Sequence, residues 1–123
     1  MNIVLWVLQA LLALVFLAAG LLKLVRPRER LRRMMPFVQD VPMGAVKLIG
    51  AIEVVGAAGL ILPALLHIAV VLTPLAAAGL VIVMTGAVVT HLRRRETGPA
   101  VVPLVLGILA AIVAVLRFGP YHF

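Results

Sequence analysis

Apolar residues fill four long runs of the chain, and polar or proline-containing breaks separate the runs. A helix rises about 1.5 Å per residue, so about 17 to 25 apolar residues are enough to cross the hydrocarbon core of a bilayer. The fold class that follows is an all-α integral membrane four-helix bundle, in which residues 1–123 form a single transmembrane domain. The runs predict spans at about residues 3–24, 45–63, 66–92 and 100–116.

Prolines set the expected ends and bends of these helices. Proline lacks a backbone N–H and its ring clashes with the preceding turn, so it ends or kinks a helix unless it lies in the first turn. We therefore expect Pro63 to end the second helix, Pro74 to bend the third and Pro103 to lie in the first turn of the fourth. The first run is expected to be a retained span, because its positive residues follow the apolar stretch instead of preceding it.

The composition is typical of a membrane protein. Hydrophobic residues make up 65% of the chain, charged residues make up 12%, and the mean hydropathy is +1.27. A soluble domain of 123 residues could not bury that much apolar surface. The implied partner is the lipid bilayer. The net charge of +7 does not indicate nucleic-acid binding, because there is no soluble basic face to carry it.

The distribution of Lys and Arg predicts the orientation in the membrane. Seven of these 11 residues lie within 23–47 and three within 93–95, whereas the opposite ends of the spans carry only Arg117. Positive loops stay in the cytoplasm, so both termini are expected to be extracytoplasmic, in a bacterial inner (plasma) membrane. Residues 27–42 combine several Arg with Leu, Met and Phe, which predicts a short basic segment lying in the membrane interface.

Residue types that support metal or thiol chemistry are scarce. The chain has no cysteine, which excludes a disulfide, a thiolate nucleophile, an iron–sulfur cluster and a dithiol redox pair. His67, His91 and His122 are expected near the outer end, near the inner end and in the tail, respectively. Because they are not expected to meet at one depth, no metal site is predicted.

Glu53 lies in an otherwise apolar stretch, residues 46–62. An acidic residue at the centre of a membrane helix costs about 2.5 to 3.5 kcal/mol. If the second span begins near Gly44, Glu53 lies about 13 Å into the membrane. It should therefore face the bundle interior, with Lys23 or a side chain of the third span as its polar partner.

Helical spacing gives Lys23 and Glu53 each a defined helix face, and small residues surround Glu53. Residues three or four apart share a helix face. The face of Lys23 on the first span also carries Gln9, Leu12, Phe16, Ala19 and Gly20, and the face of Glu53 carries Val46, Ile49, Gly50, Gly56, Ala57 and Leu60. Close helix packing is the simplest interpretation of the small residues, and a ligand cleft ending at Lys23 and Glu53 is the functional one.

These positions also carry a family resemblance. The pattern Phe16-x3-Gly20-x2-Lys23-Leu24 is followed by Gly50-x2-Glu53-x2-Gly56-x2-Gly59-Leu60 and by a third span that ends in His91 before a basic loop. This order and spacing resemble the DoxX and DoxX-like family of small four-helix membrane proteins over nearly the whole chain. The resemblance implies that Lys23, Glu53 and His91 are the family's polar positions. It also implies links to quinone-associated respiratory oxidation and to membrane oxidoreductase complexes.

Three functions stay open at this point, and none of them requires a cofactor, although a quinone is a candidate. The first is binding of a quinone or isoprenoid within the bundle, as a subunit of a membrane redox system, with a ligand site formed by Lys23, Phe16, Gly20, Gly50, Ala57 and His91. The second is a cofactor-free isomerase or epoxide-opening terpenoid cyclase in which Glu53 is the catalytic general acid. The third is a structural or assembly factor in which Glu53 only specifies helix pairing. A membrane redox partner or a second copy of the chain is a possible protein partner.

Overall fold

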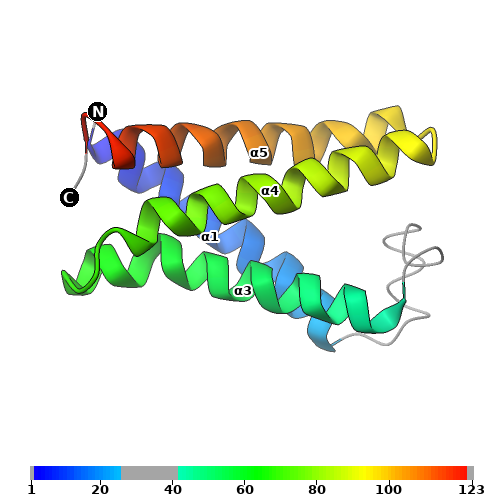
Figure 1. Cartoon of the computed structure of the whole chain (residues 1–123), viewed down its shortest axis with the longest axis horizontal. Coiled ribbons are helices and arrows are strands. Elements are labelled where there is room, and N and C mark those ends of the chain that lie inside the picture. Colours follow the sequence, from blue (N-terminus) through cyan, green and yellow to red (C-terminus); the bar gives the residue numbers. More distant parts are fainter. Residues whose placement is uncertain (1, 26–41, 122–123) are drawn as a thin grey trace.

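Four helices make up almost all of the computed structural model, which describes residues 2–25 and 42–121. Each helix is long and apolar enough to cross a membrane, and no strand occurs in these residues. This confirms the predicted all-α membrane four-helix bundle. The predicted interfacial segment 27–42 lies almost entirely outside the described residues. The helices are α1 (Asn2–Val25), α3 (Met43–Leu66), α4 (Leu72–Arg93) and α5 (Thr97–Phe118) (Figure 1).

The prolines occupy different helical positions from those predicted. Helix α3 continues past Pro63 to Leu66, and at its end the Pro63 carbonyl oxygen accepts the backbone N–H of His67. Helix α4 begins at Leu72, so Pro74 lies in its first turn, where proline is tolerated without a bend. Helix α5 begins earlier than expected, at Thr97, which places Pro103 inside the helix. These differences move the helix ends and leave all four spans in place.

The four helices are arranged as two pairs that diverge toward one end. Helix α1 packs mainly on α3, and α4 mainly on α5. The pairs lie close together at the end that carries both termini and the α3–α4 turn, and they separate toward the α4–α5 turn (Figure 1). The shared position of the termini is fixed by Arg117, whose Nη1 donates to Asn2 Oδ1 at 2.6 Å. The pairs thus diverge toward the basic end of the molecule, which carries Lys23, Lys47 and Arg93 to Arg95.

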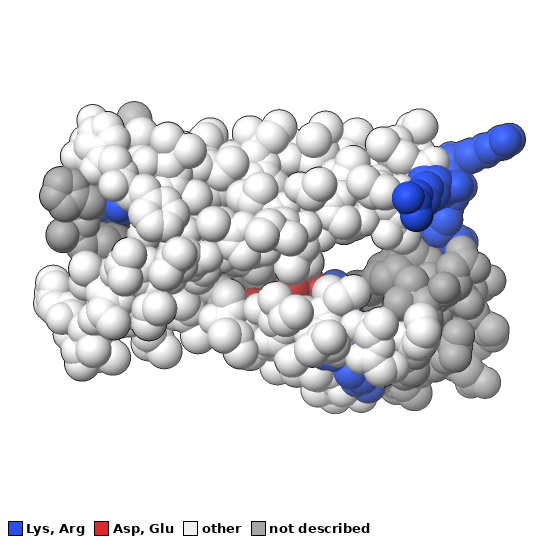
Figure 2. Space-filling model, viewed as in Figure 1, with Lys and Arg blue, Asp and Glu red and all other residues white. Residues whose placement is uncertain are grey.

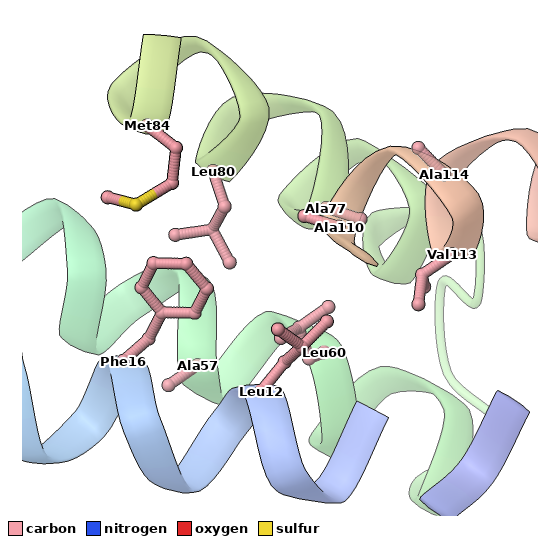
Figure 3. Close-up of a cluster of buried hydrophobic side chains, with 10 residues drawn as sticks. All are labelled: Leu12, Phe16, Ala57, Leu60, Ala77, Leu80, Met84, Ala110, Val113 and Ala114. Atoms are coloured by element: carbon pink, nitrogen blue, oxygen red, sulfur yellow. The ribbon is translucent and has the colours of Figure 1, made fainter. Parts of the chain in front are cut away.

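The apolar core joins all four helices and lies mostly in the closed half of the bundle, where the two helix pairs are close together. Phe16, Leu80 and Met84 point toward one another between α1 and α4 (Figure 3). Small side chains dominate the remainder, which lets the helices approach closely. The core comprises Leu12, Phe16, Ala57, Leu60, Ala77, Leu80, Met84, Ala110, Val113 and Ala114. Large apolar side chains also cover the outer faces of the helices, as expected for surfaces that contact lipid.

Glycines set the distance between α1 and α3. A Cβ atom on Gly20 would lie 2.6 Å from the carbonyl oxygen of Gly50, and one on Gly50 would lie 2.8 Å from the carbonyl oxygen of Gly20. Real Cβ atoms essentially never approach a heavy atom so closely. The two backbones therefore touch directly at this crossing, just before Lys23 and Glu53 along their helices.

Candidate functional site

Lys23 and Glu53 form an ion pair that joins α1 to α3. The ammonium Nζ of Lys23 donates to Oε1 of Glu53 at 2.7 Å, and the two residues are 8% and 1% exposed. This confirms that Glu53 faces the bundle interior and that Lys23 is its partner. The contact of Gly20 and Gly50 brings the helices close enough for it, since a Cβ on Gly50 would lie 2.8 Å from the Lys23 Cβ. We call these two side chains the buried ion pair.

The buried ion pair keeps unused hydrogen-bonding capacity. A lysine ammonium has three N–H donors, and a carboxylate has two acceptor oxygens. Within the described part of the chain, the bond from Nζ to Oε1 is the one hydrogen bond that these two side chains make. Two ammonium donors and the second carboxylate oxygen are therefore left for a water or a ligand.

A cavity of about 630 Å³ separates the two helix pairs at the basic end. The buried ion pair lies on its wall, and most of the remaining lining is apolar. Figure 2 shows the cavity as a hollow between the helix pairs, with acidic atoms on its floor. We call this space the central cavity; it is lined by Val15, Phe16, Ala19, Lys23, Ile49, Glu53, Ile82, Val83, Met84, Gly86, Ala87, Thr90, His91, Glu96, Pro99, Val102, Pro103 and Leu106.

His91 and Glu96 form a second polar group on the opposite wall of the central cavity. The Nδ1 atom of His91 lies 3.0 Å from Oε1 of Glu96, and the Nε atom of Arg94 lies 3.3 Å from the same oxygen. The tight α4–α5 turn makes this contact, because Arg95 adopts a left-handed φ of 59° and the Glu96 N–H donates to the His91 carbonyl oxygen at 2.8 Å. Two acid–base pairs, one from each helix pair, therefore line one cavity.

Comparison with known families identifies the class of protein. A family model described as the DoxX-like family matches residues 7–113, which run from the first turns of α1 into the last turns of α5. The chain belongs to the DoxX-like family. Neither curated proteins nor solved structures gave a match. The polar positions that the resemblance implied, Lys23, Glu53 and His91, all line the central cavity of this DoxX-like protein.

Three residues that the sequence placed in the ligand site lie outside the central cavity of this DoxX-like protein. Gly20 and Gly50 form the contact between α1 and α3, and Ala57 lies in the apolar core. None of the three lines the central cavity. The expected cleft between the first two spans is therefore replaced by a cavity between the two helix pairs. Phe16, Lys23, Glu53 and His91 do line the cavity, as does Ile49.

A second buried polar network, which sequence reasoning missed, lies at the closed end of this DoxX-like protein. Arg117 is only 2% exposed, and its Nε donates to the side-chain oxygen of Gln9 at 2.8 Å. The Gln9 amide nitrogen donates to the Leu60 carbonyl oxygen at 2.7 Å, and the guanidinium lies 5.8 Å from the centre of the Trp6 ring. The sequence feature that could have revealed this network is Arg117, the one Lys or Arg residue at the predicted outer ends of the spans. The network links α1, α3 and α5 and closes the bundle away from the cavity.

Residues 2–25 and 42–121 contain no group of three His, Cys, Asp or Glu residues placed to hold an ion.

Proposed function

We propose that this protein binds a membrane-resident lipophile with an uncharged, oxygenated head in the central cavity. The observation that carries the proposal is the buried ion pair with unused donors and an unused acceptor, placed on the wall of a cavity whose remaining lining is mostly apolar. The cavity volume of about 630 Å³ is in the range of small-molecule sites, roughly 300 to 1,000 Å³. The head lies against Lys23 and Glu53, and the apolar part lies against Phe16 and Leu106.

The charge of the site favours a neutral head group. Lys23 and Glu53 together carry no net charge, so the pair offers a charged head no net attraction that would offset the cost of removing that head from water. A carbonyl oxygen can accept from the free ammonium donors, and a hydroxyl can also donate to Glu53. A quinone and an isoprenoid alcohol both belong to this class. With a quinone bound, the protein would serve as a subunit of a membrane redox system.

Ligand titration of a cavity-filling variant tests the proposal. Gly86 lines the central cavity, and a Cβ placed on it would meet no heavy atom within 4 Å. Gly86→Leu should therefore fill the cavity without disturbing the helices. With farnesol and decylubiquinone as probes in nanodiscs, we expect about tenfold weaker binding of at least one probe, which corresponds to ~1.4 kcal/mol.

The matched control is Gly98→Leu, since Gly98 also has open space around it but does not line the cavity. It should bind both probes like the unchanged protein. Equal affinity of the unchanged protein and Gly86→Leu for both probes, or no binding of either probe to the unchanged protein, would rule the proposal out. Mass spectrometry of lipids that copurify with the protein would identify the natural ligand.

A cofactor-free enzyme is the second candidate function, and the presence of both Glu53 and His91 on the cavity wall favours it. In such an enzyme the Lys23 ammonium passes its proton to Glu53, and the Glu53 carboxyl protonates an epoxide, alkene or carbonyl. A second group accepts a proton from the resulting cation, which yields an isomer of the substrate. Glu53→Gln keeps the shape but removes the titrating proton. Incubation with epoxyfarnesol should then give an isomeric product with the unchanged protein and none with Glu53→Gln. If neither protein gives a product, the result argues against catalysis on this substrate class.

A further inference from the structure

The central cavity opens sideways toward the bilayer between α3 and α4. These helices touch in the closed half, where a Cβ on Gly56 would lie 2.8 Å from Leu80 Cδ2 and one on Gly59 would lie 2.7 Å from the Ala76 Cβ. Toward the basic end they separate, and the hollow in Figure 2 lies between them. Ile82 marks this opening, because it lines the cavity and is nevertheless 73% exposed on the lipid-facing surface.

A shallow apolar groove begins where the cavity opens. It has a volume of about 490 Å³, runs along the outer surface between α3 and α4 and continues to the closed end of the bundle. We call it the α3–α4 groove; it is lined by Ala51, Ile52, Val55, Gly56, Gly59, Pro63, Leu72, Leu75, Ala76, Gly79 and Leu80.

The cavity and the groove follow one another along the same two helices. On α3 the groove residue Ile52 is next to the cavity residue Glu53, and on α4 the groove residue Gly79 precedes the cavity residues Ile82 and Val83 by three and four positions. Residues at that spacing share a helix face. From Ile52 to Pro63 the groove extends for roughly 16 Å, at about 1.5 Å per residue. A molecule with its head at the buried ion pair can therefore continue into the groove without crossing a helix.

We infer that the α3–α4 groove holds the hydrocarbon tail of the ligand whose head lies in the central cavity. This rests on the proposed function and narrows its substrate class to long, single-chain lipids that are oxygenated at one end. The polar end of the site holds a single ion pair, which suits one head, and the groove offers that head's chain a continuous apolar surface. The ligand enters from the bilayer through the opening beside Ile82, and its tail points toward the closed end of the bundle.

Photo-crosslinking tests where the tail lies. The probes are 1-octanol and 1-hexadecanol, each with a diazirine on the terminal carbon, incorporated with the protein into nanodiscs. The short probe should label cavity residues such as Val83 and Leu106, and the long probe should label α3–α4 groove residues such as Leu72 and Leu75. Labelling by the long probe that falls on lipid-facing α1 and α5 residues instead would overturn the inference and leave the proposed function standing if the short probe still labels the cavity.

Two variants test whether binding of the tail in the groove depends on binding of the head in the cavity. Gly79→Leu should fill the groove without a clash, since a Cβ there meets nothing within 4 Å, so it should reduce groove labelling by the long probe about tenfold and leave the short probe unaffected. Gly86→Leu should reduce labelling by both probes to a similar extent. Groove labelling that persists in Gly86→Leu would show that the groove holds ordinary bilayer chains independently of the cavity. Absence of labelling by either probe in the unchanged protein would overturn the inference and the proposed function together.

Discussion

The side chains of Lys23 and Glu53 meet at 2.7 Å across 30 residues of sequence, on two helices whose backbones touch at Gly20 and Gly50. Direct backbone contact and the ion pair thus occur within one helical turn of each other. The pair belongs both to the packing of α1 on α3 and to the wall of the central cavity. Variants must therefore separate its contribution to stability from its contribution to binding.

A double variant separates the two contributions. Glu53→Leu alone leaves a buried ammonium without its partner and should lower the free energy of unfolding by about 3 to 5 kcal/mol. Lys23→Met combined with Glu53→Leu removes both charges and should recover most of that loss, because an apolar pair of similar volume is often as stable as a buried ion pair. Unfolding in detergent followed by circular dichroism measures both values. Lipophile binding should be lost in the double variant, and binding equal to that of the unchanged protein would show that the pair is purely structural.

Because Gly20 and Gly50 form the contact between α1 and α3, we expect their substitution to lower stability, whereas the sequence suggested that they bind the ligand. Gly20→Ala and Gly50→Ala force the α1 and α3 backbones apart and should each destabilise the protein by about 1 to 3 kcal/mol, the usual range for overpacking. Gly98→Ala is the control, because its Cβ has open space and alanine is the better helix former. Thermal unfolding of the three variants checks the prediction. Unfolding curves for Gly20→Ala and Gly50→Ala that match the control would contradict the close packing.

The network at the closed end should contribute to stability and not to ligand binding. Gln9→Leu removes the acceptor of Arg117 Nε and the donor to the Leu60 carbonyl, and loss of a hydrogen bond to a charged group costs about 1.5 to 3 kcal/mol. Leu11→Ala, on the lipid-facing side of the same helix, should have a much smaller effect. Unfolding measurements and farnesol titration of both variants provide the comparison. A normal unfolding free energy for Gln9→Leu would show that the network is dispensable.

The expected topology can be tested without background labelling, because the chain has no cysteine. Thr97→Cys should react with a membrane-impermeant maleimide only after the membrane is opened, whereas Pro120→Cys should react in intact cells or spheroplasts. Both positions are exposed in the structure. If Thr97→Cys reacts in intact spheroplasts and Pro120→Cys does not, the orientation is the opposite of the predicted one.

The sequence by itself determined the four spans, the membrane class and the pairing of Glu53 with a buried partner. These depend on local quantities: the length of an apolar run and the cost of one charge in hydrocarbon. The inward face of α1 was also predictable, because Gln9 and Lys23 mark it, and both are buried. Helix ends were less predictable, since α3 continues past Pro63 to Leu66 although a proline often ends a helix.

Only the tertiary structure decided where the cavity lies. In a membrane protein the lipid-facing and inward-facing sides of a helix are both apolar, so the hydrophobic pattern of α5 carries little information about its partner. The structure shows that α5 packs on α4 and that this pair diverges from α1 and α3, which brings His91 and Glu96 opposite the buried ion pair. It also assigns Gly20 and Gly50 to helix contact, because a small residue suits a close backbone approach and a cleft equally well until the neighbouring helix is in place.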